Sequence, residues 1–219
     1  MTDFIVPLCQ QQVTILYADE HIVVANKPSG LLSVPGKHPL NQDCLITRVQ
    51  QQYADAHIVH RLDMDTSGVM VLARGKANLS ALSRQFQERE TQKQYLAWVY
   101  GVLHDDAGEV NLPLRCDWPN RPKQMVDHDL GKASLTRFEV LERRPARLQT
   151  KVLLKPVTGR SHQLRVHMAE LGHPISGCEF YAHPQALMQA DRLQLHAWKL
   201  SFMHPSTGAL LTHIAPSVF

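Results

Sequence analysis

The sequence predicts a fold that combines several β-strands with a few helices, and three features carry this prediction. Residues 69–73 form an unbroken apolar run of strand length, which is typical of a strand covered on both faces. Residues 76–89 repeat apolar side chains at positions i, i+3 and i+7, which is the spacing of one helix face. Residues 136–141 and 148–154 alternate between apolar and polar side chains, as strands with one buried face do.

The remaining elements of the N-terminal half follow from the same patterns. Residues 1–12 show no periodicity and predict a loose N-terminal arm. Residues 15–17 and 22–25 read as two strands joined by a turn. Residues 26–42 predict a loop, and residues 43–53 predict a helix with apolar side chains at core spacing.

The C-terminal half adds further strands and one more helix. Residues 95–100 alternate as a strand does, and residues 104–132 are the least regular part of the chain. A third helix is expected to begin at Ser161 as N-cap and to end at Gly172. Two more strands, joined by a turn, are expected at 193–200 and 210–214.

Bulk composition indicates an ordinary globular protein of 219 residues, organised as one medium domain or two closely packed lobes. The four cysteines lie far apart and include no C-x-x-C, which favours a reducing compartment, the cytoplasm, over a disulfide framework or a zinc ribbon. The sequence has no N-terminal export signal and no apolar run of about 18 residues, so we expect neither export nor membrane insertion.

Positive charge is concentrated in one segment of the chain. Residues 137–167 hold eight Lys and Arg against two Glu, a net charge of +6, while the whole chain carries only +3. A basic surface of this kind is expected where a protein binds phosphate backbones. The alternative is a solvated face of alternating strands.

A polar stretch directly precedes the buried strand and holds the strongest functional signal. His60–Gly68 enters the protein interior or the floor of a cleft, with Asp63 at its centre. A carboxylate there must be paired, hydrogen-bonded or functional. Asp63 could cap a turn and pair with Arg61. An aspartic protease loop would need a second copy, Ser67 lacks the glycines of a nucleophile elbow, and a lone catalytic carboxylate remains open.

Four blocks give this chain a family resemblance. His60-Arg61-Leu62-Asp63 followed by Thr66-Ser67-Gly68 resembles the signature of the RluA family of pseudouridine synthases. Three further blocks agree with that family in order and spacing, namely residues 22–32, 93–101 and 158–167. The resemblance extends from about Leu16 to the C-terminus.

The resemblance implies both a fold and an activity. The implied fold is α+β, with a mixed, largely antiparallel central sheet, flanking helices and a catalytic cleft. The implied activity is isomerisation of uridine to pseudouridine in RNA without a cofactor, on a base flipped out of its stack. Many relatives carry an N-terminal S4-type RNA-binding domain; here the blocks begin too early for one, so residues 13–219 are expected to form a single catalytic domain.

The resemblance also implies roles for particular residues. Asp63 is the expected catalytic carboxylate, acting either on the sugar or on the uracil ring. Arg165, which the dipole of its helix would disfavour so near the start, is expected to pair with Asp63 and to lower its pKa. Tyr95 is expected to stack on the uracil and to help remove the carbon-5 proton, and Arg61 to fill the gap that the base leaves. The other expected substrate-binding residues are His60, Thr66, Trp118, Arg121, Lys123, Arg160, His162 and Gln163.

The choice of RNA follows from a more local similarity. Residues 112–123 are similar to the subgroup that modifies both tRNA, in the anticodon stem-loop, and large-subunit (23S) rRNA. An enzyme for one RNA class, an enzyme for free nucleosides and a non-catalytic RNA-binding module are the alternatives. His162 and His167 are five residues apart and have no ligand pattern around them, so no metal site is expected. Nor is an obligate protein partner expected, which predicts a monomer.

One position departs from the family pattern. Relatives usually carry Gly-Asp before an aromatic pair, whereas this chain has Gly177 and Cys178 before Glu179, Phe180 and Tyr181. Replacing the Asp by Cys178 is expected to change the local hydrogen bonding of this loop more than the chemistry.

Overall fold

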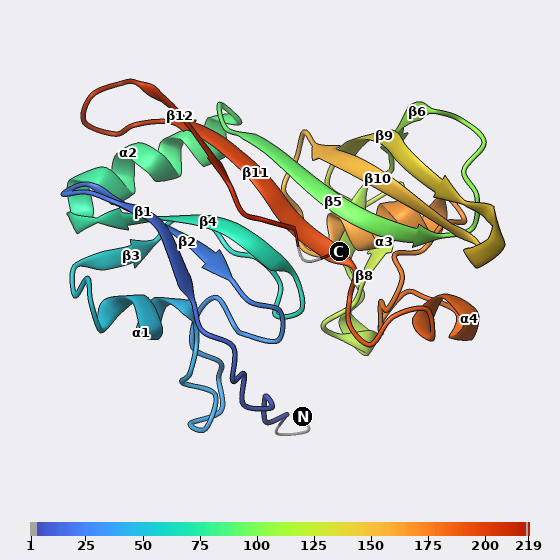
Figure 1. Ribbon diagram of the computed structural model, residues 1–219, viewed down its shortest axis with the longest axis horizontal. Coiled ribbons are helices and arrows are strands. Elements are labelled where there is room, and N and C mark those ends of the chain that lie inside the picture. The colour runs from blue at the N-terminus through green and yellow to red at the C-terminus, as the bar shows by residue number, and fades with distance from the viewer. Residues whose placement is uncertain (1–3, 218) are drawn as a thin grey trace. The chain divides into compact units, whose positions relative to one another are not determined.

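The computed structural model describes residues 4–217 and 219, which fall into two compact units (Figure 1). Unit 1 comprises residues up to Lys93 together with the segment from Ala197 to residue 218. Unit 2 comprises Gln94–His196 and Phe219. Strands β5 (Gln92–Tyr100) and β11 (Leu195–Met203) each carry the chain from one unit into the other.

Unit 1 is built on a sheet with the strand order β1-β2-β4-β11. Strand β12 pairs with β11, and β3 pairs with β4. The pairings β1–β2, β2–β4, β3–β4 and β11–β12 are antiparallel. Apart from β11, these strands are β1 (Thr14–Ala18), β2 (Ile22–Lys27), β3 (Ala56–Ile58), β4 (Ser67–Arg74) and β12 (Leu210–Ile214). Seven of the eight residues of β4 are buried, which confirms the strand predicted from the apolar run.

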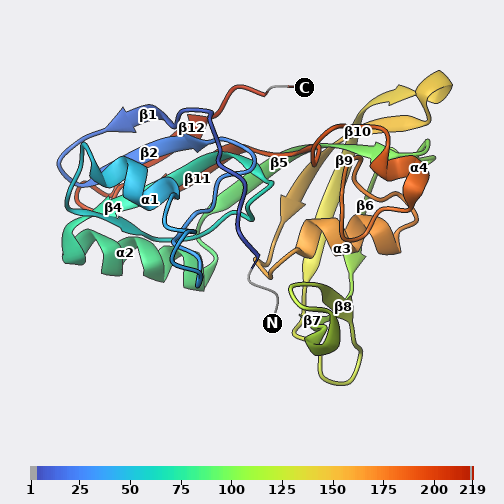
Figure 2. The same ribbon diagram turned by 90° about the horizontal axis from the view of Figure 1, so that it is seen from below.

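Two helices belong to unit 1. Helix α2 (Gly75–Glu88) matches its prediction and lies along one face of the sheet (Figure 2). It ends at Arg89, which adopts the left-handed conformation. Helix α1 (Leu45–Gln50) is shorter than predicted, because Cys44 serves as its N-cap and the Thr47 side chain closes a capping box there.

Unit 2 contains a second group of antiparallel strands, in the order β5-β10-β9-β6. Apart from β5, these are β6 (Ala107–Asn111), β9 (Leu135–Arg144) and β10 (Gln149–Pro156). Strands β7 (Leu114–Cys116) and β8 (Gln124–Val126) form a separate hairpin with a 3₁₀ turn at Trp118–Asn120. Figure 2 shows this β7–β8 hairpin projecting beyond α3 (Gln163–Glu170).

Helix α3 is a core helix, and its start differs from the prediction. Its N-cap is His162, not Ser161, and His162 has a φ of 53° with no side-chain cap bond. The His162 ring is instead bonded to the hydroxyl of Tyr181, which draws it away from a capping role. Residues 163–168 are all buried, so the helix has no solvent-exposed face along this length. Gly172, with a φ of 85°, follows the helix end as predicted.

The predicted α+β fold with a largely antiparallel sheet is confirmed. The elements that were not predicted are short, namely β3, β6, β7, β8 and the four-residue helix α4 (Pro184–Leu187). Segments of three to five residues hold too little of a pattern for periodicity to identify them. Strand β11 also lies two to three residues later than the predicted 193–200.

The single domain and N-terminal arm remain predictions. Residues 4–12 contain no helix or strand and are tied to unit 1 by two side chains. Asn41 bonds the main chain of Phe4 and Val6, and Arg48 bonds that of Cys9 and Gln11. Among the described residues, no helix is both long enough and apolar enough to cross a membrane.

Candidate active site

Asp63 lies on the loop that joins β3 to β4 in unit 1. Its side chain is partly exposed, and its main-chain carbonyl accepts a 3.2 Å hydrogen bond from the N–H of Thr66. Thr66 itself is buried. This bond closes a tight turn over residues 63–66. Ser67 and Gly68, which suit a turn by residue type, instead begin strand β4. Arg61 is exposed on the same loop.

A buried lysine holds this loop in place. Lys27 is fully buried, and its ammonium donates to the carbonyl oxygens of Pro28 at 2.9 Å, Leu31 at 2.7 Å and Met64 at 2.9 Å. Met64 directly follows Asp63 in the chain. The structure thus favours a structural role for Lys27.

Two serines fix the loop on either side of the same carboxylate. The Ser33 hydroxyl donates to the carbonyl of Leu62 at 2.7 Å and accepts from the Leu62 N–H at 3.2 Å. The Ser29 hydroxyl donates to the carbonyl of Asp65 at 2.7 Å. The backbone before and after Asp63 is therefore anchored to residues 27–33, which positions the carboxylate from a rigid base.

His60 is part of this framework. Its ring stacks on Phe86 with centroids 4.4 Å apart, and its Nε2 accepts a 3.2 Å hydrogen bond from the Val71 N–H. Burial, assisted by the positive charge of Lys93, lowers the pKa of His60 to about 3. A neutral, stacked imidazole favours a structural role, and its predicted RNA contact is not tested by this geometry.

Gly68, the last residue of the signature, allows a close approach between strands. It has a φ of 123°, and a Cβ atom there would lie 2.2 Å from the carbonyl oxygen of Ala197 in β11. Only glycine fits this backbone and this contact. The signature therefore requires Gly68 for packing of β4 against β11.

In unit 2, Arg165 lies buried in a cradle of three side chains. It is 2 % exposed, and its Nε donates to the Sγ of Cys178 at 3.3 Å. Its guanidinium carbon lies 5.0 Å from the ring centroid of Phe180 and 5.5 Å from that of Tyr181. Both distances are within the range of cation–π attraction. The residue that contacts Arg165 is therefore Cys178, the position at which this chain departs from the family pattern.

Tyr181 connects this cradle to the β7–β8 hairpin. Its hydroxyl accepts a 2.8 Å hydrogen bond from the Gln124 N–H at the start of β8. The same oxygen lies 2.6 Å from Nδ1 of His162, whose ring is stacked on Phe180. A tyrosine hydroxyl can both accept and donate, so Tyr181 ties the ring of His162 to the start of β8.

Gln163 is buried, and its amide is saturated with hydrogen bonds inside unit 2. Its Oε1 accepts from the Thr158 hydroxyl at 2.7 Å and from the Arg160 N–H at 3.0 Å. Its Nε2 donates to the Leu135 carbonyl at 3.0 Å and to the Thr136 hydroxyl at 3.0 Å. An amide makes four such bonds, so the geometry favours a structural role over direct RNA contact.

His167 extends this network from α3. Its Nδ1 lies 2.9 Å from the Thr136 hydroxyl, and its Nε2 lies 3.0 Å from the carbonyl of Leu112, just before β7. Burial lowers the pKa of His167. The sequence pattern did not identify Thr136 as a partner of His167. Its position beside α3 depends on the register of strand β9, which no local pattern predicts.

Tyr95 lies in β5, opposite Leu154 of β10. Its side chain is partly exposed and packs against the buried core of unit 2. The ring is thus held by apolar contacts on one side while part of it reaches solvent.

The β7–β8 hairpin presents the predicted aromatic and cationic side chains. Trp118 is 64 % exposed, and the guanidinium carbon of Arg121 lies 4.5 Å from its ring centroid. Lys123 is partly exposed and Arg121 is exposed. An exposed tryptophan stacked with a cation is suited to contact with a nucleobase.

The basic segment is less positive in the structure than its sequence suggests. Four of its cations lie in surface ion pairs, namely Arg137–Glu109, Arg143–Asp106, Arg144–Glu142 and Lys155–Glu139. Glu109 and Asp106 come from β6 and the loop before it, outside the segment where the charges were counted. A broad basic surface on these strands is therefore largely offset. Arg160 is exposed on the turn before α3.

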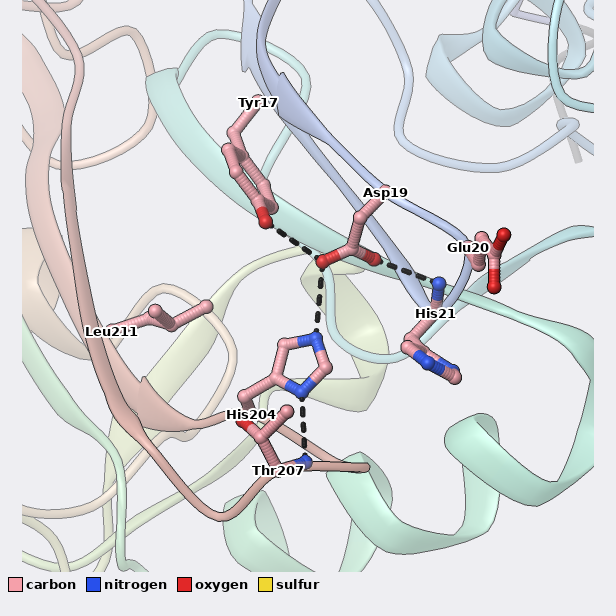
Figure 3. A pocket seen from close by; sticks show the side chains of 7 residues that line it. All are labelled: Tyr17, Asp19, Glu20, His21, His204, Thr207 and Leu211. Carbon is pink, nitrogen blue, oxygen red and sulfur yellow. Dashed lines mark hydrogen bonds and ion pairs between the residues drawn. The ribbon is translucent and has the colours of Figure 1, made fainter.

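A separate pocket lies in unit 1, with a volume of about 350 Å³. Figure 3 shows the Tyr17 hydroxyl and the His204 ring converging on the carboxylate of Asp19. Partial burial alone would raise the pKa of Asp19, but the N–H groups of His21 and Ile22, with Tyr17 and His204, lower it to about 2. The polar groups satisfy one another, and the cluster joins the β1–β2 turn to the β11–β12 turn.

The part of the chain that the structure describes, residues 4–217 and 219, contains no candidate metal site. No group of three or more His, Cys, Asp or Glu side chains there could hold a metal ion. The four cysteines are free thiols.

Comparison with known proteins agrees with the motif and the fold. A family model described as RNA pseudouridylate synthase matches residues 21–170. The chain is 53 % identical over 213 residues to the dual-specificity RNA pseudouridine synthase RluA of Haemophilus influenzae, covering 97 % of each chain. It is 55 % identical over 207 residues to the protein of that name from Escherichia coli K12, covering 94 % of each chain.

Solved structures give the same answer. The structure of human RNA pseudouridylate synthase domain containing 1 matches with a TM-score of 0.80 at 29 % identity, covering 96 % of this chain and 86 % of that one. The fold and the His60–Gly68 signature define an isomerase that converts uridine in RNA to pseudouridine. The chain belongs to the RluA family of RNA pseudouridylate synthases.

Proposed function

We propose that this enzyme modifies two kinds of RNA, the anticodon stem-loop of tRNA and large-subunit (23S) rRNA. The observation that carries the proposal is the similarity to relatives named dual-specificity RNA pseudouridine synthases, which extends over 97 % of both chains for one of them. The target uridine lies in a stacked stem or loop, so it is flipped out before reaction, at a cost of about a few kcal/mol.

Asp63 is the catalytic carboxylate of this proposal. The reaction breaks the bond between uracil N1 and the sugar C1′, turns the ring, joins C5 to C1′, and transfers a proton from C5 to N1, so that no atom is gained or lost. Asp63 attacks either the sugar C1′ or the uracil ring. This role is supported by the backbone, which hydrogen bonds fix on both sides of Asp63, from Leu62 to Asp65. A nucleophile must be held close to its productive geometry.

Arg165 and Tyr95 complete the chemistry. The guanidinium of Arg165 pairs with the Asp63 carboxylate. Tyr95 stacks on the flipped uracil, and its hydroxyl assists removal of the C5 proton. In support of these roles, Arg165 is buried and held in a cradle of three side chains, and Tyr95 is anchored in β5 with part of its ring exposed.

RNA binding is assigned to exposed groups outside this centre. Arg61 occupies the gap that the flipped base leaves. The β7–β8 hairpin provides Trp118 for stacking, and Arg121, Lys123 and Arg160 neutralise phosphates. Affinity for RNA should therefore fall as the salt concentration rises. The enzyme acts as a cytoplasmic monomer, and its free thiols fit a reducing compartment.

The experiment is pseudouridine mapping by carbodiimide-dependent stops of reverse transcription. Cellular RNA from a strain that lacks the protein is compared with the same strain rescued by wild type, by Asp63→Asn or by Asp105→Asn. Asp105 is an exposed carboxylate and controls for the chemical change. We expect tRNA and rRNA sites to vanish together and to return with wild type and Asp105→Asn only.

Each other outcome contradicts a specific part of the proposal. Loss of sites in one RNA class alone would limit the enzyme to that class. Full rescue by Asp63→Asn would remove Asp63 from the chemistry. A strain that keeps every site would point to a non-catalytic RNA-binding protein.

A further inference from the structure

The sulfur of Cys178 accepts a hydrogen bond from Nε of Arg165. We infer that Cys178 is a positioning residue for pseudouridine formation, acting through Arg165. The inference rests on the proposed function, in which the Arg165 guanidinium pairs with Asp63. Cys178 itself contacts Arg165 and no reacting atom in this scheme, so it is not a catalytic residue.

The aromatic rings alone do not fix the guanidinium. Phe180 and Tyr181 lie 5.0 and 5.5 Å from its central carbon, and attraction to a ring face holds a cation near the ring. That attraction depends weakly on rotation of the guanidinium about its own centre. A hydrogen bond is directional, so the 3.3 Å contact from Nε to the Cys178 sulfur restricts this rotation and with it the direction of the two terminal nitrogens.

The loop that carries the sulfur is itself held firmly. Cys178 is fully buried, its N–H donates to the Ile175 carbonyl at 3.2 Å, and its own carbonyl accepts from Ala182 at 3.0 Å. Gly177 before it has a φ of 71°, and a Cβ there would lie 2.2 Å from the Arg192 carbonyl oxygen. The sulfur therefore has little freedom to move, which is what a positioning contact requires.

The chemistry of the acceptor gives the inference its test. A thiol sulfur is a weak acceptor, a hydroxyl oxygen is a stronger one, and a methyl group accepts nothing. If the acceptor function matters, activity must follow the acceptor rather than the volume of the side chain. Cys178→Ala removes the acceptor, whereas Cys178→Ser keeps an acceptor at nearly the same place.

The experiment measures the single-turnover rate on a tRNA stem-loop with the enzyme in excess, and the dissociation constant of the same RNA. We expect Cys178→Ala to lower the rate constant roughly tenfold to a hundredfold, the range that a small misplacement of a reacting group produces, with RNA affinity within about twofold of wild type. Cys178→Ser should recover most of the rate. Should Cys178→Ala not fold, Cys178→Val takes its place as the variant without an acceptor.

Cys44→Ala is the matched control, because Cys44 is the other fully buried cysteine and its sulfur contacts Thr47 instead. It should lose stability without losing rate. A rate for Cys178→Ser as low as that for Cys178→Ala, or a loss no larger than that of Cys44→Ala, would overturn the inference. Failure of the proposed function looks different: wild type itself would then make no pseudouridine, or Arg165→Ala would react as fast as wild type.

Discussion

The ammonium group of Lys27 lies 2.9 Å from the main-chain carbonyl oxygen of Met64, the residue that follows Asp63. Lys27 is fully buried, and it also donates to two further carbonyls, those of Pro28 and Leu31. A buried charge is tolerated only where hydrogen bonds replace its water. Here the bond to Met64 also ties the loop of the candidate nucleophile to the end of β2.

Replacing Lys27 by methionine should therefore destabilise the protein and displace the loop. Lys27→Met keeps most of the side-chain volume but leaves three carbonyls without their donor, and we expect the free energy of unfolding to fall by roughly 2–4 kcal/mol. Urea denaturation measures this change. Lys37→Met is the control, because Lys37 is exposed and should change stability by no more than about 0.5 kcal/mol. Equal stability of the two variants would show that the buried ammonium contributes nothing.

Gly68 should be irreplaceable for a different reason. A Cβ at Gly68 would lie 2.2 Å from the Ala197 carbonyl oxygen, and the φ of 123° adds backbone strain. We expect Gly68→Ala to lower the free energy of unfolding by about 3–5 kcal/mol, from overpacking and strain together. Gly30 also has a positive φ, of 79°, but open space around it, so Gly30→Ala should cost only about 1–2 kcal/mol. Thermal unfolding of both variants separates the clash from the strain.

The parts of the fold that the sequence could predict are those with a long, regular pattern. The apolar run at 69–73 gave β4, and the spacing in residues 76–89 gave α2, because burial of one face or both leaves a direct trace in the sequence. The start of α3 could not be predicted, since His162 is drawn to Tyr181 by a contact 19 residues away. The basic segment looked unbalanced because two of its acidic partners lie before residue 110.

In the candidate site, too, local motifs could be recognised in the sequence and tertiary contacts could not. Family resemblance pointed to Asp63 in the signature and to Arg165 in the block of residues 158–167. The residues that hold these two side chains could not be predicted from either motif. Lys27 contacts the Asp63 loop across 37 positions of the chain, and the bond from Arg165 to Cys178 depends on how the loop after Gly177 folds. Such contacts are set by tertiary packing, which leaves no local period.

His60 should make stability depend on pH. Its pKa in the folded protein is about 3, well below the usual value of about 6.5 for an unfolded chain. Between these values the unfolded chain binds a proton that the folded protein does not, so stability falls as the pH falls below about 6.5. His60→Gln, whose amide can still accept from Val71, should lose less stability between pH 7 and pH 4. His167 and His213, whose pKa values burial also lowers, contribute equally to both proteins.

The check is urea denaturation of wild type and His60→Gln at several pH values. Asp19 makes stability depend on pH only at lower pH, since its pKa is lowered to about 2. Its contribution to the free energy of unfolding is lost as the pH falls from about 4 towards 2. Parallel curves for the two proteins between pH 7 and pH 4 would mean that His60 is protonated in the folded state.

Trp118 should contribute to RNA affinity without contributing to stability. It is 64 % exposed on the β7–β8 hairpin, with Arg121 stacked on its ring. A base stacked on an aromatic side chain is worth roughly 1–3 kcal/mol, so Trp118→Ala should weaken binding of a tRNA stem-loop by a factor of roughly 5 to 150. Leu130→Ala is the control, because Leu130 is 74 % exposed beyond β8 but offers no stacking surface. Filter binding at fixed salt measures both variants.

Arg121 should act on the same complex through its charge. Arg121→Gln removes one phosphate-neutralising group, so the slope of log affinity against log salt should become shallower by about 0.7 to 1. Trp118→Ala should leave that slope unchanged while lowering the affinity at every salt concentration, because stacking releases no counterions. If Trp118→Ala bound RNA as tightly as Leu130→Ala, the hairpin would lie outside the RNA interface, and the positive charge for binding would have to come from Arg160 and the remaining exposed cations.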